Sequence, residues 1–456
     1  MQPSLAWVPM RWPSDWRDPA LLSLLKGSPI NCLVLDWAAA NANNTLAEAA
    51  RAAGLAIVGL LGAQAEAPVV AAAELAGLAA LGSAEPVQTR LPVIPWEEKS
   101  RLRWDSASPV LAASDGVWPG VQLGQGEEAG PTGLPWIDSN GWWLRLARAR
   151  APEKVCWVAA EPPADASFIR ASHYALALAD TYAHGGRLLL SLDPKLRAGL
   201  AARNESALDM WKAIMAALAF FTTHEEWAGL EPQGTIGVIS SFAGEDEDFS
   251  GEILNLLARR GVPYRVYPKE RAAAARFDGL LGIIYADRSA PEAALGARLQ
   301  HFMENGGLLI AGAKWPNKPA VPSGTDVYRR FDVHKIGKGR LAVSKEDPAD
   351  PFLVAGDAQL LLSFRNVPVR LFNTGTLNTF YTGTADGRRA MLHIINYAMR
   401  RFGHPASVAF TGKFRTAKMW TPEGPAKALD LAPTLDGGIE VHLPAFNLYA
   451  AVELEA

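Results

Sequence analysis

Cysteine is scarce in this chain, because Cys32 and Cys156 are the only two among 456 residues. Both stand inside apolar stretches, NCLVLDW and KVCWVAAE, whose composition predicts strands. Two isolated cysteines exclude a disulfide framework, and their spacing matches no zinc motif. We therefore expect both thiols to be small, buried hydrophobic side chains.

Long apolar runs are also missing. No stretch reaches the roughly 18 uncharged residues of a membrane-spanning helix, since Glu, Arg or Gly interrupts each Ala-rich segment. The N-terminal sequence MQPSLAWVPMRWPSDW contains Pro, Trp and charged residues where a signal peptide has a continuous apolar core. These features predict a cytoplasmic protein without a membrane partner, or a secreted protein if a signal peptide has been removed.

Neither sign of charge is in marked excess. Lys and Arg total 44, Asp and Glu total 47, and the formal net charge is -3. This balance provides no broad positive surface for a nucleic-acid backbone, so no nucleic-acid partner is expected. The eight histidines form neither HxH nor HExxH, and no GxSxG or Walker sequence occurs. We therefore expect no metal site and no cofactor.

The chain does have the length and the apolar content for several cores. Hydrophobic residues make up 49% of it, and its length corresponds to roughly two to four domains. From Leu5 to about Trp227, strand-like runs alternate with helical periodicity, which predicts a (β/α)8-like barrel over residues 1–229. An open doubly wound sheet is the alternative, but no Gly-rich phosphate-binding sequence accompanies it. The eight strand candidates are residues 5–10, 30–37, 55–62, 78–84, 91–96, 109–115, 154–161 and 187–193.

A second α/β segment follows the linker-like sequence GLEPQG. Its strand–helix–strand order, from TIGVISS to LLIAGAK, predicts a flavodoxin-like domain over residues 233–372. Beyond it the helical periodicity nearly disappears, and short strand-like runs are separated by Asp-Gly and Gly-His-Pro turns. Residues 373–456 are therefore expected to form a small C-terminal β-sandwich.

The stretches GVWPGVQ, PWIDSNGWW, VAAEPP and LLLSLD resemble those of a set of uncharacterised bacterial TIM-barrel proteins that are described as glycoside hydrolases without an established activity. The order of the three domains resembles glycoside hydrolase family 42, the β-galactosidases whose middle domain looks like a class I glutamine amidotransferase and serves trimerisation. The resemblance implies a carbohydrate substrate and a homo-oligomer formed through the middle domain. Amidotransferase chemistry itself is excluded, because residues 233–372 contain no cysteine to supply the thiolate nucleophile.

Carboxylates and tryptophans recur where the predicted barrel strands end. Catalytic groups of such barrels come from the carboxyl ends of the strands and the loops that follow them. Glycoside hydrolysis needs two carboxyl groups, and aromatic faces bind the apolar side of a sugar ring. We therefore predict a carbohydrate site there. Its substrate-binding candidates are Asp36, Trp37, Glu85, Trp96, Asp115, Trp118, Trp136, Asp138 and Asn140.

Glu161 and Asp193 are the favoured catalytic pair. They follow what read as successive strands, and the strand spacing of about 4.8 Å suits the roughly 5–5.5 Å between the carboxyls of a retaining enzyme. The family 42 resemblance implies a different pair. If residues 78–84 form the fourth strand and 154–161 the seventh, Glu85 and Glu161 match the strands that carry that family's two carboxylates. The family's acid/base follows an Asn, whereas Glu85 follows Ala84.

Structural roles compete with the catalytic ones. Asp138, Ser139 and Asp193 precede helical segments, where Asp and Ser more often cap a helix than catalyse. Asn140 could bind a substrate hydroxyl or form a turn with Gly141. Three functions therefore remain open: a glycoside hydrolase is the leading hypothesis, a non-catalytic carbohydrate-binding or scaffold protein derived from one is the rival, and an isomerase or lyase is third.

Overall fold

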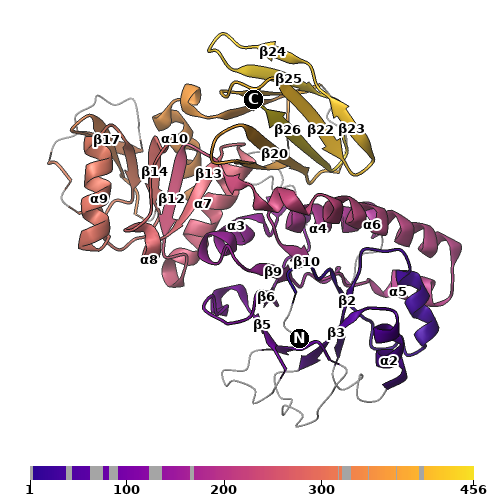
Figure 1. Ribbon diagram of the computed structural model, residues 1–456. Helices are drawn as coiled ribbons and strands as arrows, with labels where there is room; N and C mark the ends of the chain where they lie inside the picture. Colours follow the sequence, from indigo (N-terminus) through magenta and orange to yellow (C-terminus); the bar gives the residue numbers. More distant parts are fainter. Residues whose placement is uncertain are drawn as a thin grey trace. The chain divides into compact units, whose positions relative to one another are not determined.

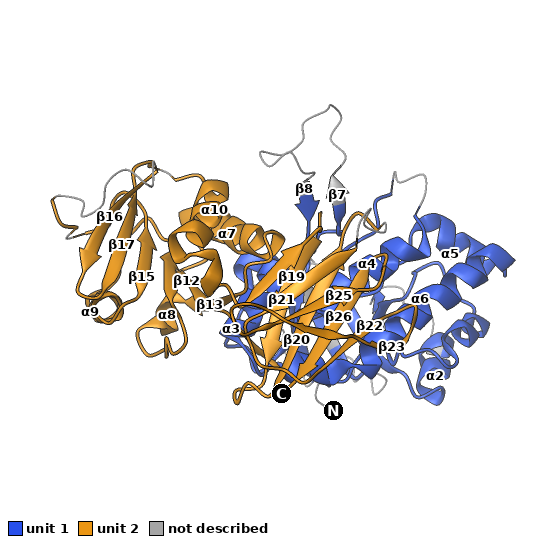
Figure 2. Cartoon of the chain, turned by 90° about the horizontal axis from the view of Figure 1, so that it is seen from above, with its two compact units in different colours: residues 1–122, 137–229 blue, residues 123–136, 230–456 orange. Residues whose placement is uncertain are grey.

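The structure is a computed structural model that describes residues 4–36, 44–61, 75–81, 91–122, 136–164, 169–316, 318–320, 330–347, 349–375, 377–399 and 405–456. The chain divides into two compact units (Figure 2). Unit 1 comprises residues 1–122 and 137–229, and unit 2 comprises residues 123–136 and 230–456. No helix among the described residues is long and apolar enough to cross a membrane.

Unit 1 contains an eight-stranded sheet in which every neighbouring pair is parallel. All eight strands overlap the runs predicted from the sequence, although the last is much shorter than expected. In sheet order they are β1 (Pro9–Arg11), β2 (Cys32–Asp36), β3 (Ala56–Leu61), β4 (Gly77–Leu81), β5 (Val93–Glu97), β6 (Val110–Ala113), β9 (Val155–Val158) and β10 (Arg187–Leu188).

The chain beyond β10 also pairs with β1. Met10 and Leu190 form a parallel bridge. The Arg11 N–H donates to the Leu190 carbonyl at 2.9 Å, and the Leu190 N–H donates to the Pro9 carbonyl at 3.1 Å. These bonds join the last strand to the first, and the labelled strands of unit 1 surround a common centre in Figure 1.

Helices follow most of these strands and lie outside them (Figure 1). The sequence predicted an α-helix after β1, but η1 (Pro19–Leu25) is a 3-10 helix, capped by the Asp18 carboxylate. The helix predicted between β3 and β4 falls outside the described residues. The remaining helices are α2 (Asn44–Ala52), η2 (Lys99–Arg101), α3 (Gly141–Arg150), α4 (Ala171–Tyr182), α5 (Pro194–Ala201), α6 (Glu205–Thr223) and η3 (Glu225–Gly229). The short strands β7 (Gly120–Gln122) and β8 (Trp136–Asp138) form a separate two-stranded sheet.

Alternate residues of β2 to β6 and β9 form a hydrophobic core, which includes Cys32, Val34, Val58, Ile94, Val110 and Trp157. Two of the tryptophans in it, Trp7 and Trp157, pack with ring centroids 6.3 Å apart. Both cysteines are free and buried, as predicted, and burial raises the pKa of the Cys156 thiol to about 12. Neither thiol is therefore a nucleophile at neutral pH.

Unit 2 begins with a mostly parallel six-stranded sheet. Its order is β13 (Tyr264–Pro268), β12 (Ile236–Ser240), β14 (Gly282–Tyr285), β15 (Leu308–Ala311), β17 (Gly339–Ser344) and β16 (Phe331–Ile336), and only β16 is antiparallel. Residues of α8 (Lys269–Ala272) and α9 (Ala293–Glu304) share one core with the sheet. The other two helices, α7 (Glu247–Arg259) and α10 (Pro351–Leu362), contact each other. The sequence did not predict α10.

The rest of unit 2 consists of two antiparallel sheets that share one hydrophobic core. One sheet contains β11 (Glu231–Pro232), β19 (Leu377–Gly383), β20 (Arg389–Asn396), β26 (Tyr449–Glu455), β22 (Thr416–Thr421) and β23 (Gly424–Ala428). The other contains β18 (Val369–Phe372), β21 (Ala406–Phe410), β25 (Ile439–Leu443) and β24 (Leu431–Pro433). Because β18 pairs with β21, residues before 373 also belong to these sheets.

A buried carboxyl in α7 makes the stability of unit 2 depend on pH. Burial raises the pKa of Glu252 from its usual 4.5 to about 7, and its Oε1 accepts no hydrogen bond among the described residues. The folded state therefore favours the neutral carboxyl, and this stabilisation, complete below pH 4.5, is lost as pH rises through 7.

Gln at position 252 stays neutral at every pH. We therefore expect the unfolding free energy of Glu252→Gln, relative to that of the parent protein, to be about 1–2 kcal/mol higher at pH 8 than at pH 4, a figure discounted for partial solvent screening. Urea unfolding at both pH values measures the difference. The exposed Glu423→Gln is the control. An equal effect of Glu252→Gln at both pH values would contradict the expectation.

Candidate functional site at the strand ends of unit 1

Predicted carboxylates lie at the end of the sheet where the parallel strands terminate. Asp36 is the last residue of β2, Asp115 comes two residues after β6, and Glu161 comes three residues after β9. All three residues are exposed. Since all eight strands run in the same direction, these side chains share one end of the sheet.

Glu161 is held through one oxygen. Its Oε1 accepts a hydrogen bond from the Arg11 guanidinium at 2.7 Å and another from the Ser191 hydroxyl at 3.1 Å. Its Oε2 accepts no hydrogen bond within the described part of the chain. The side chain of Glu161 is 53% exposed and that of Arg11 44% exposed, so the ion pair orients the carboxylate and adds little stability.

Asp193, the predicted partner of Glu161, is buried and caps α5. Its Oδ1 accepts from the backbone N–H groups of Lys195 and Leu196, both at 3.0 Å. Its Oδ2 accepts from the Tyr174 hydroxyl at 2.9 Å. The predicted capping role of Asp193 is therefore confirmed. Asp138 and Ser139 were also predicted to cap a helix, but the N-cap residue of α3 is Asn140.

Tyr174 bonds to Asp193 and also experiences the charge of Glu161. Burial raises the pKa of Tyr174 above its ordinary value, and the charges of Asp193 and Glu161 raise it further. The phenol therefore stays protonated at neutral pH and donates to Asp193. The ring of Trp118 meets the Tyr174 ring edge to face, with centroids 5.2 Å apart and planes at 84°. Trp118 therefore packs against the tyrosine that bonds to Asp193, and its predicted role in sugar binding stays a prediction.

The loop that carries Trp118 is fixed at two points. A Cβ on Gly116 would stand 2.5 Å from Val158 Cγ1 and 2.7 Å from the Ala159 carbonyl, so only glycine lets the loop approach β9 this closely. Asn140 is fully buried and brackets Val117, accepting from its N–H at 3.0 Å and donating to its carbonyl at 2.8 Å.

The remaining amide hydrogen of Asn140 goes to Asp180, at 2.8 Å. No amide hydrogen of Asn140 is left for a substrate, so the predicted contact with a sugar hydroxyl is wrong for this arrangement. Asn140 instead holds the backbone on which Trp118 stands.

Other predicted residues lie elsewhere. Trp96 is 3% exposed inside the core, where no substrate reaches it. Asp115 accepts from the Lys99 N–H at 2.9 Å, and Asp138 is half-buried in β8. Trp37, Glu85 and the side chain of Trp136 lie outside the described residues. No group of three His, Cys, Asp or Glu side chains suited to a metal ion occurs in the described ranges.

The residues around Glu161 and Asp193 described above are called the Glu161 cluster. Three of them were not identified from the sequence. Arg11 ends β1, and the arginine that closes the run LAWVPMR was the available signal. Ser191 follows β10 in the run LLLSLD. The pattern of apolar and polar residues in this run does not show whether Ser191 lies in the core or at the site. Tyr174 stands in the helical stretch SHYALALAD and resembled an ordinary core aromatic. Two of the three come directly from strand ends, where barrel sites are built.

Comparison with solved structures identifies proteins of similar fold, whereas sequence comparison does not. No protein-family model matches the sequence, and no curated protein matches it. The α-L-fucosidase isoenzyme 2 from Paenibacillus thiaminolyticus aligns over 100% of both chains with a TM-score of 0.64 and 10% identity. The polyextremophilic β-galactosidase from the Antarctic haloarchaeon Halorubrum lacusprofundi aligns over 100% of this chain and 99% of its own, with a TM-score of 0.50 and 11% identity.

The fold of the whole chain is thus similar to that of glycoside hydrolases, as the domain order suggested. A GH42 β-galactosidase from G. stearothermophilus aligns over 88% of this chain and 64% of its own at 10% identity. Its TM-score of 0.39 is too low to add to the comparison. At such identities the likeness concerns the fold alone, and the activity must be argued from the site.

Proposed function

We propose that the chain is a (β/α)8-like barrel over residues 1–229, a flavodoxin-like domain that begins at residue 233 and a C-terminal β-sandwich. The hydrogen bonds between Leu190 and β1 support a closed barrel. The order β13-β12-β14-β15-β17 supports a doubly wound sheet. The shared core of the two antiparallel sheets supports the sandwich, and the pairing of β18 moves its start from residue 373 to Val369.

We propose further that the chain is a glycoside hydrolase whose site lies at the carboxyl ends of the barrel strands. The observation that carries this proposal is Glu161, an exposed carboxylate held through Oε1, whose Oε2 accepts no hydrogen bond from the residues that the structure describes. Trp118 stands in the same cluster as a candidate sugar platform. An oriented carboxylate and an aromatic ring for the apolar face of a sugar are two requirements of glycoside cleavage.

The second carboxylate is either Asp193 or Glu85. Asp193 lies in the same cluster, but both of its oxygens are occupied within the protein. The sheet order makes β4 the fourth strand and β9 the seventh, which supports the strand count behind the alternative pair of Glu85 and Glu161. We therefore propose Glu85 as the partner to test first, with Asp193 as a positioning residue.

Substitution of Asp193 distinguishes a catalytic role of this residue from a positioning role. We expect Asp193→Asn to keep the α5 cap and to retain most activity, since Asn is as good a cap as Asp. Asp193→Ala should cost about 1–2 kcal/mol of unfolding free energy, because it removes the cap and leaves the Tyr174 hydroxyl without its acceptor. If Asp193→Asn instead abolished hydrolysis at unchanged stability, Asp193 would be the catalytic partner. Glu85→Gln is measured alongside.

A panel of aryl glycosides tests the function itself. The similar structures are named a fucosidase and a galactosidase, so α-L-fucosides and β-D-galactosides come first in the panel. Release of the aryl group, lost on replacement of Glu161, is the expected result. Sugar binding without turnover of any glycoside would leave the non-catalytic alternative in its place.

A further inference from the structure

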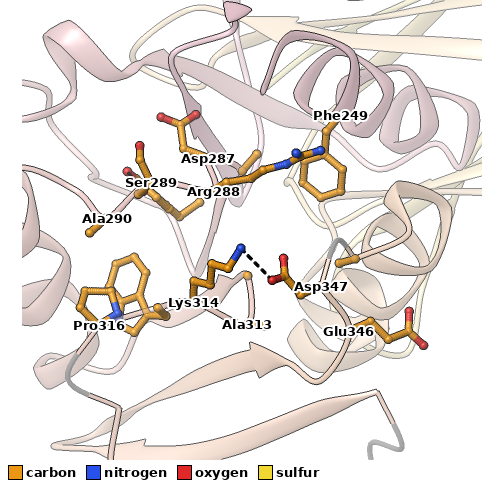
Figure 3. A pocket seen from close by; sticks show the side chains of 15 residues that line it. Phe249, Asp287, Arg288, Ser289, Ala290, Ala313, Lys314, Pro316, Glu346 and Asp347 are labelled. Atoms are coloured by element: carbon orange, nitrogen blue, oxygen red, sulfur yellow. Dashed lines mark hydrogen bonds and ion pairs between the residues drawn. The ribbon is translucent and has the colours of Figure 1, made fainter. Parts of the chain in front are cut away.

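A pocket opens in unit 2 at the carboxyl ends of the parallel strands, and none of its lining residues belongs to unit 1 (Figure 3). It is a shallow, partly open crevice: the space between its lining residues amounts to about 520 Å³ only when the part open to solvent is included. Its walls come from the loops after β14, β15 and β17 and from Phe249 in the first turn of α7. Crevices at this edge of an open α/β sheet are the usual ligand sites of such folds.

The loop after β14 is anchored by a buried carboxylate. The side chain of Asp287 is 1% exposed. Its Oδ1 accepts from the Ser240 hydroxyl at 2.6 Å and from the Ser241 N–H at 2.8 Å, and its Oδ2 accepts from the Lys269 ammonium at 2.8 Å. A carboxylate so fully bonded fixes the backbone beside it. The next two residues, Arg288 and Ser289, are therefore presented to the pocket from a rigid base.

Aromatic rings line the same pocket. The Trp315 ring packs edge to face on Tyr285, with centroids 5.4 Å apart and planes at 74°. Tyr285 is itself fixed, because its hydroxyl donates to the Ser289 carbonyl at 2.9 Å. Phe249 lines the pocket from α7, and Arg288 reaches toward it in Figure 3. Trp315 is only partly buried, so it offers apolar surface to a ligand.

The charged groups of the pocket are nearly balanced. Lys314 and Asp347 form an ion pair at 2.9 Å, with side chains 69% and 42% exposed. Arg288 is 48% exposed and lies 3.9 Å from Glu245. Cations and carboxylates are thus both present at the opening, which favours neither a strongly anionic nor a strongly cationic ligand. Paired donors and acceptors suit hydroxyl groups, each of which donates and accepts at once.

We propose that this pocket is a second carbohydrate site, which binds a neutral sugar unit. The ring would pack its apolar face on Trp315, and its hydroxyls would bond Lys314, Asp347 and Arg288. The site contains no part of the Glu161 cluster, so binding here requires no hydrolysis. The inference therefore stands or falls independently of the proposed activity.

The test is binding of neutral mono- and disaccharides to the full-length protein. Saturation-transfer NMR with glucose, galactose, mannose, maltose, cellobiose and lactose at about 10 mM detects millimolar affinities, and calorimetry gives the Kd of the best ligand. The measurement is made in Glu161→Gln, so that turnover does not interfere. We expect Trp315→Ala to weaken binding about tenfold, the loss of an aromatic contact together with its buried area.

Companion variants guard against a folding defect in Trp315→Ala. Asp347→Ala alters an exposed side chain and should weaken the same ligand several-fold, whereas Lys338→Ala, exposed in the turn between β16 and β17, should leave its Kd unchanged. The proposal is overturned if no saccharide binds, or if saccharide binding is equal in Trp315→Ala, Asp347→Ala and Lys338→Ala. Inorganic phosphate is the opposing probe, and phosphate binding lost in Lys314→Ala without saccharide binding would make the pocket an anion site instead.

Discussion

Replacing Glu161 with Gln is expected to lower the kcat for aryl glycoside hydrolysis about 10²–10⁴-fold, the usual contribution of a positioned general acid or base. Gln preserves the size of the side chain and can still accept from Arg11 and Ser191, but it neither ionises nor carries an acidic proton. The fold should therefore persist while proton transfer or nucleophilic attack is lost. Initial rates on the most rapidly cleaved glycoside of the panel measure the effect.

The control for this substitution is Glu226→Gln, which changes an exposed carboxylate of η3 in the same unit. It should leave kcat and KM unchanged. Equal rates for Glu161→Gln and the parent protein would remove Glu161 from the mechanism. Loss of activity together with altered circular dichroism would instead show a structural effect, which Arg11→Gln would then reproduce because it breaks the same contact.

Replacing Trp157 with Ala should destabilise unit 1 by about 3–4 kcal/mol. The side chain is fully buried in the core of the eight strands and packs against Trp7. Its removal leaves a large cavity among the tightly packed strand residues, which can relax only in part to fill it. The indole N–H has no hydrogen-bond partner among the described residues, so losing it offsets a little of the cost.

Chemical denaturation of the full chain, followed by far-ultraviolet circular dichroism, measures this loss. Trp157→Phe keeps most of the volume and should cost about 1 kcal/mol. Leu5→Ala, at a side chain 45% exposed, should change the unfolding free energy little. A Trp157→Ala variant as stable as Leu5→Ala would show that the centre of the sheet is not a packed core.

Strand positions in unit 1 could be predicted because each strand is an apolar run bounded by helical or turn sequence. The lengths could not. The run at 187–193 predicted a long strand, but only Arg187 and Leu188 pair regularly with β9. Leu190 forms its bridge with Met10 of β1. Hydrophobicity indicates that a residue is buried, whereas hydrogen bonding depends on neighbours remote in the sequence.

Site residues were harder to predict than strands, because tryptophans of the core and tryptophans of the candidate site both occur at strand ends. Trp96 and Trp118 have similar contexts, yet one is core and the other stands beside Tyr174. Alternation does not reveal which face of a strand points inward when both faces are covered. Tyr174 reaches the cluster from a helix, and no local pattern indicates that a helical tyrosine will bond to a carboxylate 19 residues later.

The contact between Leu190 and β1 also bears on how the protein is made. Because synthesis proceeds from the N-terminus, β1 leaves the ribosome long before the segment that covers its outer edge. Until then, β1 and its neighbours expose unpaired backbone groups to which other chains can add. Nascent chains truncated before Arg187 should therefore need a chaperone to remain dispersed, and those that extend past Leu190 should not.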